Sequence, residues 1–166
     1  MRRVIALLPF VLVVAAGCGG GDSTETVTVG STGTAPPLSK AEYIEQADAI
    51  CAGFRPKAEA LTDEANKLAD QGDSAGAADK LGEAIDVSRA GVEELQSLPK
   101  PQGDEAVLNQ LDDLRQQALA LLERVEDAIR ADDISRLDAL TSEATSVDDR
   151  GDGIATGYGF KTCGQN

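Results

Sequence analysis

Histidine and tryptophan are absent from this sequence of 166 residues, and aromatic residues make up only 3% of it. The lack of histidine excludes Ser-His-Asp and Cys-His catalysis, the usual zinc sites, c-type haem attachment and the Glu-x-x-His di-iron sites of many helical bundles. The scarcity of rings disfavours a stacking platform for sugars or nucleobases, and no phosphate-binding loop with a lysine and a following hydroxyl is present. We therefore expect a protein that is not an enzyme and that uses no cofactor.

Positive charge is also scarce. The sequence has 15 Lys and Arg against 29 Asp and Glu, a formal net charge of -14, and the net charge is -16 without Arg2 and Arg3. Nucleic acids and bare anionic lipid headgroups both require a basic footprint, so neither is an expected partner. Acidic side chains around helices most often serve solvation, although a cationic partner remains compatible with this charge.

A long hydrophobic run occurs only at the N-terminus. Arg2-Arg3 precede an apolar run over 4–17, which is shorter than the ~20 residues of a membrane span but has the form of a secretory signal. The segment Val14-Ala15-Ala16-Gly17-Cys18 resembles the bacterial lipobox, in which the cysteine is lipidated and becomes the mature N-terminus; here Ala15 stands where leucine is usual. An ordinary cleaved leader is the alternative. We predict a lipoprotein signal peptide over 1–17 and lipidation of Cys18.

Residues 18–38 are rich in Gly, Ser and Thr and have too little apolar surface to fold. We predict that they form a flexible tether. The tether ends at Pro36 and Pro37, because the residue before a proline avoids helix. Attachment of sugars to its Ser and Thr residues is an alternative to a plain spacer. The predicted protein is thus exported and anchored by acyl chains, such as palmitate, to the outer face of the cell membrane, with a helical domain over 39–166.

The helical domain begins with a capping box formed by Ser39 and Glu42. Apolar residues then recur at heptad spacing; they are Ile44, Cys51, Ala58 and Ala65, interleaved with Ala47, Phe54, Leu61 and Leu68. Because this pattern continues past Pro56, it predicts one helix over about 40–71, bent near Ala52, whose carbonyl loses its usual donor. Two helices split over 53–56 are the alternative.

Three further helices follow. The second begins after Gly72-Asp73-Ser74 and ends before Pro99, the third spans about 104–131, and the fourth is capped by Asp132-Asp133 and weakens through later glycines. The third has the strongest apolar pattern, so we expect it to be the most buried. The second has a face of small residues, which permits either close packing or ligand space. Short connections between four such helices predict an all-α, antiparallel, up-down-up-down four-helix bundle.

The two cysteines of the helical domain, Cys51 and Cys163, lie near its two ends. In an exported domain two cysteines usually pair, and an antiparallel bundle brings the tail beside the first helix. We predict a Cys51–Cys163 disulfide around which four rings pack; these rings are Tyr43, Phe54, Tyr158 and Phe160. A redox-active pair is disfavoured because there is no Cys-x-x-Cys and no histidine to lower a thiol pKa.

The acidic stretch 148–153 begins like a calcium loop, with Asp148 first, Asp152 fifth and glycine sixth. However, Arg150 holds the third position and Gly159 the twelfth, where a bidentate glutamate belongs. We therefore predict no metal site. Asp148 and Asp152 are also the carboxylates on which catalysis would have to depend in this chain, and we expect none.

Two segments carry a resemblance to known proteins. Residues 43–51, Y-I-E-Q-A-D-A-I-C, and residues 157–164, G-Y-G-F-K-T-C-G, are similar to segments of small lipoproteins and secreted helical proteins of high-GC actinobacteria. The resemblance implies lipidation, a disulfide and a helical fold, and it implies no activity.

These features together predict a non-catalytic, membrane-anchored lipoprotein that acts as a helical interaction or structural module of the cell envelope. Its partners would be the membrane, through the lipid on Cys18, and another envelope protein. A different hypothesis is a carrier that binds a small apolar ligand or a cation between its helices. It rests on the small residues that face the interior, such as Gly82, Ser88 and Gly91.

Overall fold

Four α-helices make up most of residues 36–164, the part of the chain that the structure, a computed structural model, describes. They are α1 (Lys40–Asp70), α2 (Ser74–Ser97), α3 (Glu105–Arg130) and α4 (Ile134–Tyr158), and no strand occurs among the described residues. The predicted all-α four-helix fold is confirmed. Within 36–164 none of the helices combines the length and hydropathy needed to cross a bilayer. The predicted signal peptide, the lipidation at Cys18 and most of the predicted tether lie outside the described residues.

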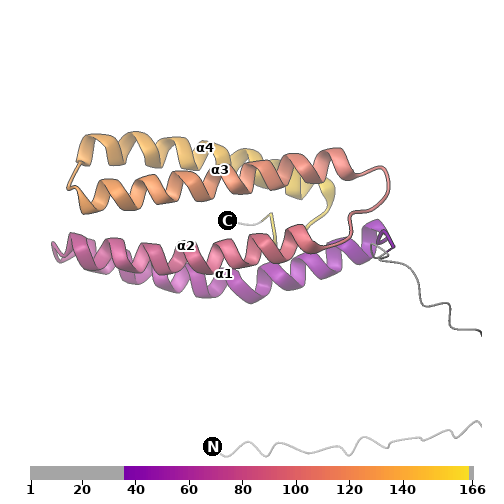
Figure 1. The fold of residues 1–166 in the computed structure, drawn as a ribbon, viewed down its shortest axis with the longest axis horizontal. Coiled ribbons are helices and arrows are strands. Elements are labelled where there is room, and N and C mark those ends of the chain that lie inside the picture. The colour runs from indigo at the N-terminus through magenta and orange to yellow at the C-terminus, as the bar shows by residue number, and fades with distance from the viewer. Residues whose placement is uncertain (1–35, 165–166) are drawn as a thin grey trace, which may run out of the picture. The chain divides into compact units, whose positions relative to one another are not determined.

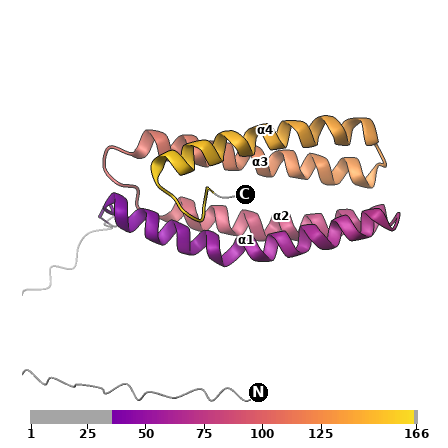
Figure 2. The same cartoon turned by 180° about the vertical axis from the view of Figure 1, so that it is seen from behind.

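Helix α1 is a single helix that contains Pro56, as the apolar pattern predicts. Its capping box is present: the Ser39 hydroxyl accepts a hydrogen bond from the Glu42 amide, and the Glu42 carboxylate accepts one from the Ser39 amide at 2.9 Å. Because Pro56 has no N–H, the carbonyl of Ala52 lacks its helical donor. Figure 2 shows α1 bowed along its length, consistent with a bend at this point.

Helices α2 and α4 also begin where local chemistry predicts. The carboxylates of Asp73 and Asp133 accept hydrogen bonds from backbone amides in the first turns of α2 and α4, at 2.9 and 3.1 Å. Helix α4 continues through its three glycines and ends at Gly159, whose φ of +116° favours glycine over any other residue. The chain then leaves the helix as a short tail.

Helices α2 and α3 have the same number of buried residues, eight each. The expectation that α3 alone is the most buried element is therefore wrong. The reason lies in the order of packing, since α2 packs against both α1 and α3, and α3 packs against both α2 and α4. The two inner helices are covered on two sides, whereas α1 and α4 are each packed against a single helix.

Helices α1 and α4 stand apart, because no Cα atom of one lies within 8 Å of a Cα atom of the other. In Figure 1 the pair α1 and α2 forms one layer and the pair α3 and α4 forms the other. Figure 2 shows the tail after α4 running down towards α1 across the space between the layers. On this side of the bundle the backbones of α1 and α4 are not adjacent, and the two helices are joined by the tail and by the edge-on contact of the Tyr43 and Tyr158 rings, whose centroids are 6.4 Å apart.

Candidate functional site

The tail is attached to α1 by the disulfide between Cys51 and Cys163, whose Cα atoms are 5.4 Å apart. This confirms the predicted pairing, which joins residues separated by 112 positions. The Arg55 guanidinium also donates a hydrogen bond to the carbonyl of Thr162 at 2.5 Å. The tail is therefore fixed to α1 both covalently and by hydrogen bonds.

Asp48 is a second attachment point for the tail, and sequence analysis missed it. Its carboxylate accepts hydrogen bonds from the amides of Lys161, Thr162 and Cys163 at 2.9, 2.9 and 3.0 Å. Burial raises the pKa of Asp48, but the three amide donors and the charge of Lys161 outweigh this and hold the pKa below its usual value. The available signal was its position one helical turn before Cys51, on the same face of α1.

Three of the four rings expected around the disulfide contact one another. The ring centroids of Tyr43, Tyr158 and Phe160 lie 5.2 to 6.4 Å apart. The fourth ring, Phe54, packs at the edge of this cluster and lies against α2 at Gly91, where a Cβ atom would come within 2.2 Å of the ring. At Gly91, the small face of α2 therefore serves close packing against the ring of Phe54.

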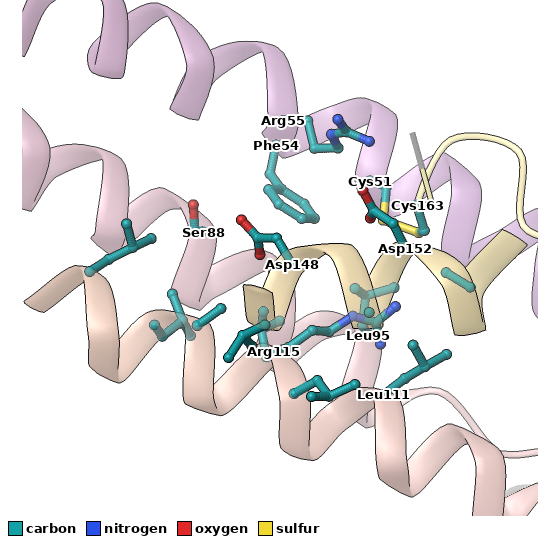
Figure 3. Close-up of a pocket in the computed structure, with 18 residues that line it drawn as sticks. Cys51, Phe54, Arg55, Ser88, Leu95, Leu111, Arg115, Asp148, Asp152 and Cys163 are labelled. Carbon is teal, nitrogen blue, oxygen red and sulfur yellow. A yellow bond between two sulfur atoms is a disulfide. The ribbon is translucent and has the colours of Figure 1, made fainter. Parts of the chain in front are cut away.

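A cavity of about 240 Å³ opens beside the disulfide, and we call it the central cavity. Figure 3 shows its lining, to which all four helices contribute. Apolar side chains form most of the wall and include Cys51, Phe54, Val92, Leu114, Ala118 and Val147. Two larger hollows, of about 540 and 520 Å³, are each lined by only two neighbouring helices. Of these three hollows, the central cavity is therefore the one that is lined by all four helices.

Four charged side chains also line the central cavity: Arg55 from α1, Arg115 from α3, and Asp148 and Asp152 from α4. The two carboxylates are one helical turn apart, so they lie on the same face of α4. Both stand out in the sequence, in a stretch that begins like a calcium loop. The structure instead places the whole stretch 148–153 inside α4, and no group of three or more Asp, Glu, Cys or His side chains within 36–164 is arranged to hold a metal ion.

The two arginines have partners of their own. Arg115 donates a hydrogen bond to Asp112 at 3.1 Å, and Asp112 also accepts one from the Lys100 ammonium at 2.6 Å. Arg55, besides its bond to the tail, lies 3.6 Å from the carboxylate of Glu59. Both guanidinium groups are thus held in place by the fold.

Asp148 has no hydrogen bond or ion pair with any other residue in the described part of the chain. Burial raises its pKa, the neighbouring charges of Asp152 and Asp149 raise it further, and Arg55 offsets part of the rise. Burial also raises the pKa of Asp152, against the charge of Arg55. Asp148 nevertheless keeps more than a third of its surface accessible, so it lies at the rim, where the cavity meets solvent.

Comparison of the chain with protein-family models, with curated proteins and with solved structures found no match. Its function is therefore inferred from the geometry of the described residues. That geometry offers an apolar space with a carboxylate at its rim, an arrangement suited to holding a small molecule.

Proposed function

We propose that this chain is a non-catalytic binding module of the cell envelope that holds a small, mainly apolar molecule in the central cavity. The observation that carries the proposal is the cavity itself, about 240 Å³ in volume and lined by all four helices where α1 and α4 stand apart. An engineered cavity of about 150 Å³ with an apolar lining binds benzene. The central cavity is therefore large enough for a molecule with one ring.

The expected affinity is modest. Ligand pockets are commonly ~300 Å³ or larger, so the central cavity fits only a small ligand. A ligand that buries roughly 100 Å² of apolar surface gains about 2.5 kcal/mol from desolvation, before the cost of losing its free motion. Since about 2.5 kcal/mol corresponds to a dissociation constant of about 15 mM, we expect molecules of one ring to bind no more tightly than this, and tighter binding only for a ligand that also uses the charged rim.

The predicted lipid on Cys18 and the predicted tether belong to the same proposal. A signal peptide followed by a lipidated cysteine would hold the module at the outer face of the membrane. The tether would let the helical domain stand off from the lipid surface. The support for this part is the sequence alone, through the lipobox-like segment that ends at Cys18 and the composition of 18–38.

A docking module for another envelope protein is the alternative. Ile134 is the single large hydrophobic residue that is exposed within 36–164, with 61% of its surface accessible, whereas docking surfaces commonly present an apolar patch of several hundred Å². A partner would then have to recognise acidic charge. Native mass spectrometry of the protein extracted gently from its membrane separates the two: a protein-sized added mass favours docking, and a small added mass favours the cavity.

The cavity proposal is tested by nuclear magnetic resonance titration of the oxidised chain with benzyl alcohol. We expect shifts at amides of residues that line the central cavity. The variant Ala118→Leu, which places a larger side chain into the cavity, should abolish these shifts. Ala106→Leu is the matched control, because Ala106 is an exposed alanine on the same helix.

The unfolding midpoint of each variant shows whether the fold is intact, and Val92→Leu provides a second cavity-filling change if Ala118→Leu does not fold. Absence of shifts at cavity residues in the unmodified chain contradicts the proposal. Equal shifts in the unmodified chain and both cavity-filling variants also contradict it, because the alcohol would then bind elsewhere.

A further inference from the structure

We infer that the ligand of the central cavity carries a single ammonium group, and that the carboxylate of Asp148 binds it. This rests on the proposed function, since it names the chemical class of the molecule that the cavity would hold. The inference joins two observations: an apolar wall contributed by all four helices, and one carboxylate at the rim that forms no hydrogen bond or ion pair with another described residue and is only partly offset by the charge of Arg55.

The charges that face the cavity come from three helices. Arg55 on α1, Arg115 on α3, and Asp148 and Asp152 on α4 line it, whereas α2 contributes only the hydroxyl of Ser88 as a polar side chain. That hydroxyl donates to the carbonyl of Ala84 within its own helix at 2.9 Å. The four charged side chains are therefore the groups of the site that could bind a polar part of a ligand.

The arginines do not favour an anionic ligand. Arg115 is held by Asp112 at 3.1 Å, and Arg55 by the carbonyl of Thr162 and by Glu59. An incoming carboxylate would have to displace these partners and would also approach two aspartates of like charge. A neutral ligand meets no such repulsion, but it leaves the charge of Asp148 unbalanced.

Asp148 differs from the other three charged groups because no described residue forms a hydrogen bond or an ion pair with it. Figure 3 places its carboxylate towards the part of the cavity that holds Phe54 and Ser88, away from the disulfide, beside which Asp152 is drawn. The charge of Arg55 offsets only part of the desolvation of this carboxylate, and an ammonium would offset more of it by a charge-assisted hydrogen bond. Burial and the charges of Asp152 and Asp149 raise the pKa of Asp148 more than Arg55 lowers it, which agrees with a charge that is only partly compensated.

The inferred ligand is thus a small amine with an apolar body. Benzylammonium matches both features of the site, because its ring suits the apolar wall and its ammonium suits the rim. Benzyl alcohol and benzoate have nearly the same size and shape, with a neutral and an anionic group in place of the ammonium. The three molecules therefore separate the effect of charge from that of apolar contact.

The test is a titration of the oxidised chain at pH 7 with each of the three probes, followed by the amide resonances of α4. We expect benzylammonium to bind about fivefold more tightly than benzyl alcohol, a modest ratio because the rim is partly solvated. Benzoate should bind more weakly than the alcohol. Asp148→Asn should remove the preference for the ammonium and leave the affinity for the alcohol unchanged.

Asp149→Asn is the matched control, since it removes the same charge from the next residue of α4, which is exposed and does not line the cavity. It should keep the preference. Equal affinities for ammonium and alcohol in the unmodified chain overturn this inference but leave the proposed function standing, and binding of none of the probes removes both. Loss of the preference in both variants also overturns the inference, because overall acidity and not Asp148 would then select the cation.

Discussion

The two ends of the described bundle hold their outer helices in different ways. At the disulfide end, which we define by Tyr43, Cys51, Tyr158, Phe160 and Cys163, the tail joins α1 to α4 through a covalent bond and through side chains. At the aliphatic end, small and branched side chains form the core; they include Ala65, Leu81, Val125, Ala128 and Leu140. There α1 and α4 are connected only by way of α2 and α3.

Near the aliphatic end, the polar interactions between helices are ion pairs, which are weaker than the covalent bond at the disulfide end. Lys80 lies 3.6 Å from Glu64, and Arg130 lies 2.8 Å from Asp79. Because at least one partner of each pair is largely exposed, such pairs contribute little to the free energy of unfolding. We therefore expect the aliphatic end to open locally at lower free energy than the disulfide end. The central cavity lies where the two regions meet.

Removal of the disulfide should lower the free energy of unfolding more than any of the other changes, and it tests whether the disulfide end depends on its covalent bond. The double variant Cys51→Ala, Cys163→Ala should lose about 4 to 5 kcal/mol of unfolding free energy, because the bond closes a loop of over a hundred residues. Urea unfolding followed by circular dichroism measures the loss, with the unmodified oxidised chain as reference. Hydrogen exchange should show that amides of the tail lose protection most. A loss below about 1 kcal/mol would show that the disulfide end does not depend on its covalent link.

Asp48 tests the non-covalent attachment of the same end. Asp48→Ala removes three hydrogen bonds to a charged acceptor and should cost about 3 kcal/mol at pH 7. Because folding lowers the pKa of this carboxyl from 3.8, its contribution is present above pH 3.8 and is lost as the pH falls through the folded value. The difference between the two proteins should therefore shrink in acid. Glu45→Ala, a change at an exposed carboxylate of α1, is the control.

If the penalty of Asp48→Ala is the same at pH 7 and at pH 2, the carboxylate does not act through its charge. If Glu45→Ala has an equal effect, the loss reflects the charge of the helix and not the attachment of the tail.

Much of this architecture could be predicted from the sequence, because most of the signals are local. The Ser39–Glu42 capping box and the passage of α1 through Pro56 follow from local residue chemistry, whereas the disulfide partners follow from the cysteine count of an exported domain and from the bundle topology. The apolar pattern was less reliable in detail. It placed Ile44 on the buried face, whereas its neighbour Tyr43 is completely buried and Ile44 only partly. Near the disulfide, α1 packs against the tail as well as against α2. A heptad pattern describes packing between helices, so it does not predict which residues of α1 contact the tail.

The candidate site was harder to predict for a related reason. Apolar spacing indicates which face of a helix is buried, but it does not give the distance between helices that are not consecutive. The separation of α1 and α4, and with it the central cavity, therefore had no signal in the sequence. Asp148 and Asp152 stand out in the sequence as a cluster that begins like a calcium loop, within a fourth helix that the later glycines are expected to weaken. Tertiary packing kept these residues helical, and this brought both carboxylates to one face.

The packing of Phe54 at the boundary between the two ends can also be tested by its effect on stability. Gly91→Ala would place a Cβ atom 2.2 Å from the ring of Phe54, so we expect a loss of about 2 kcal/mol as the ring is displaced. Gly153→Ala is the matched control, because its Cβ atom would meet nothing within 4 Å and helix propensity favours alanine. It should stabilise the protein by about 0.5 kcal/mol. Thermal unfolding measures both, and equal effects of the two variants would contradict the close packing.

Asp148→Asn should have the smallest effect on stability, and in the opposite direction. Since folding raises the pKa of Asp148 from 3.8, the folded chain binds this proton more tightly than the unfolded chain, and stability falls as the pH rises through that interval. The variant should therefore be more stable at pH 7, by no more than about 0.5 kcal/mol because solvent screens a residue at the rim. The gain should vanish below pH 3.8. Urea midpoints at pH 7 and pH 3 measure it.

Asp149→Asn again provides the control, because it removes an equal charge from the acidic chain without changing the lining of the cavity. A larger gain for Asp148→Asn than for Asp149→Asn isolates the effect of the cavity from general repulsion. Benzylammonium should raise the midpoint of the unmodified chain more than that of Asp148→Asn, since a ligand that binds only the folded state stabilises it. A carboxylate that lowers stability when alone and raises it when paired with a cation is what a binding residue requires, whereas a solvated surface aspartate would show neither effect.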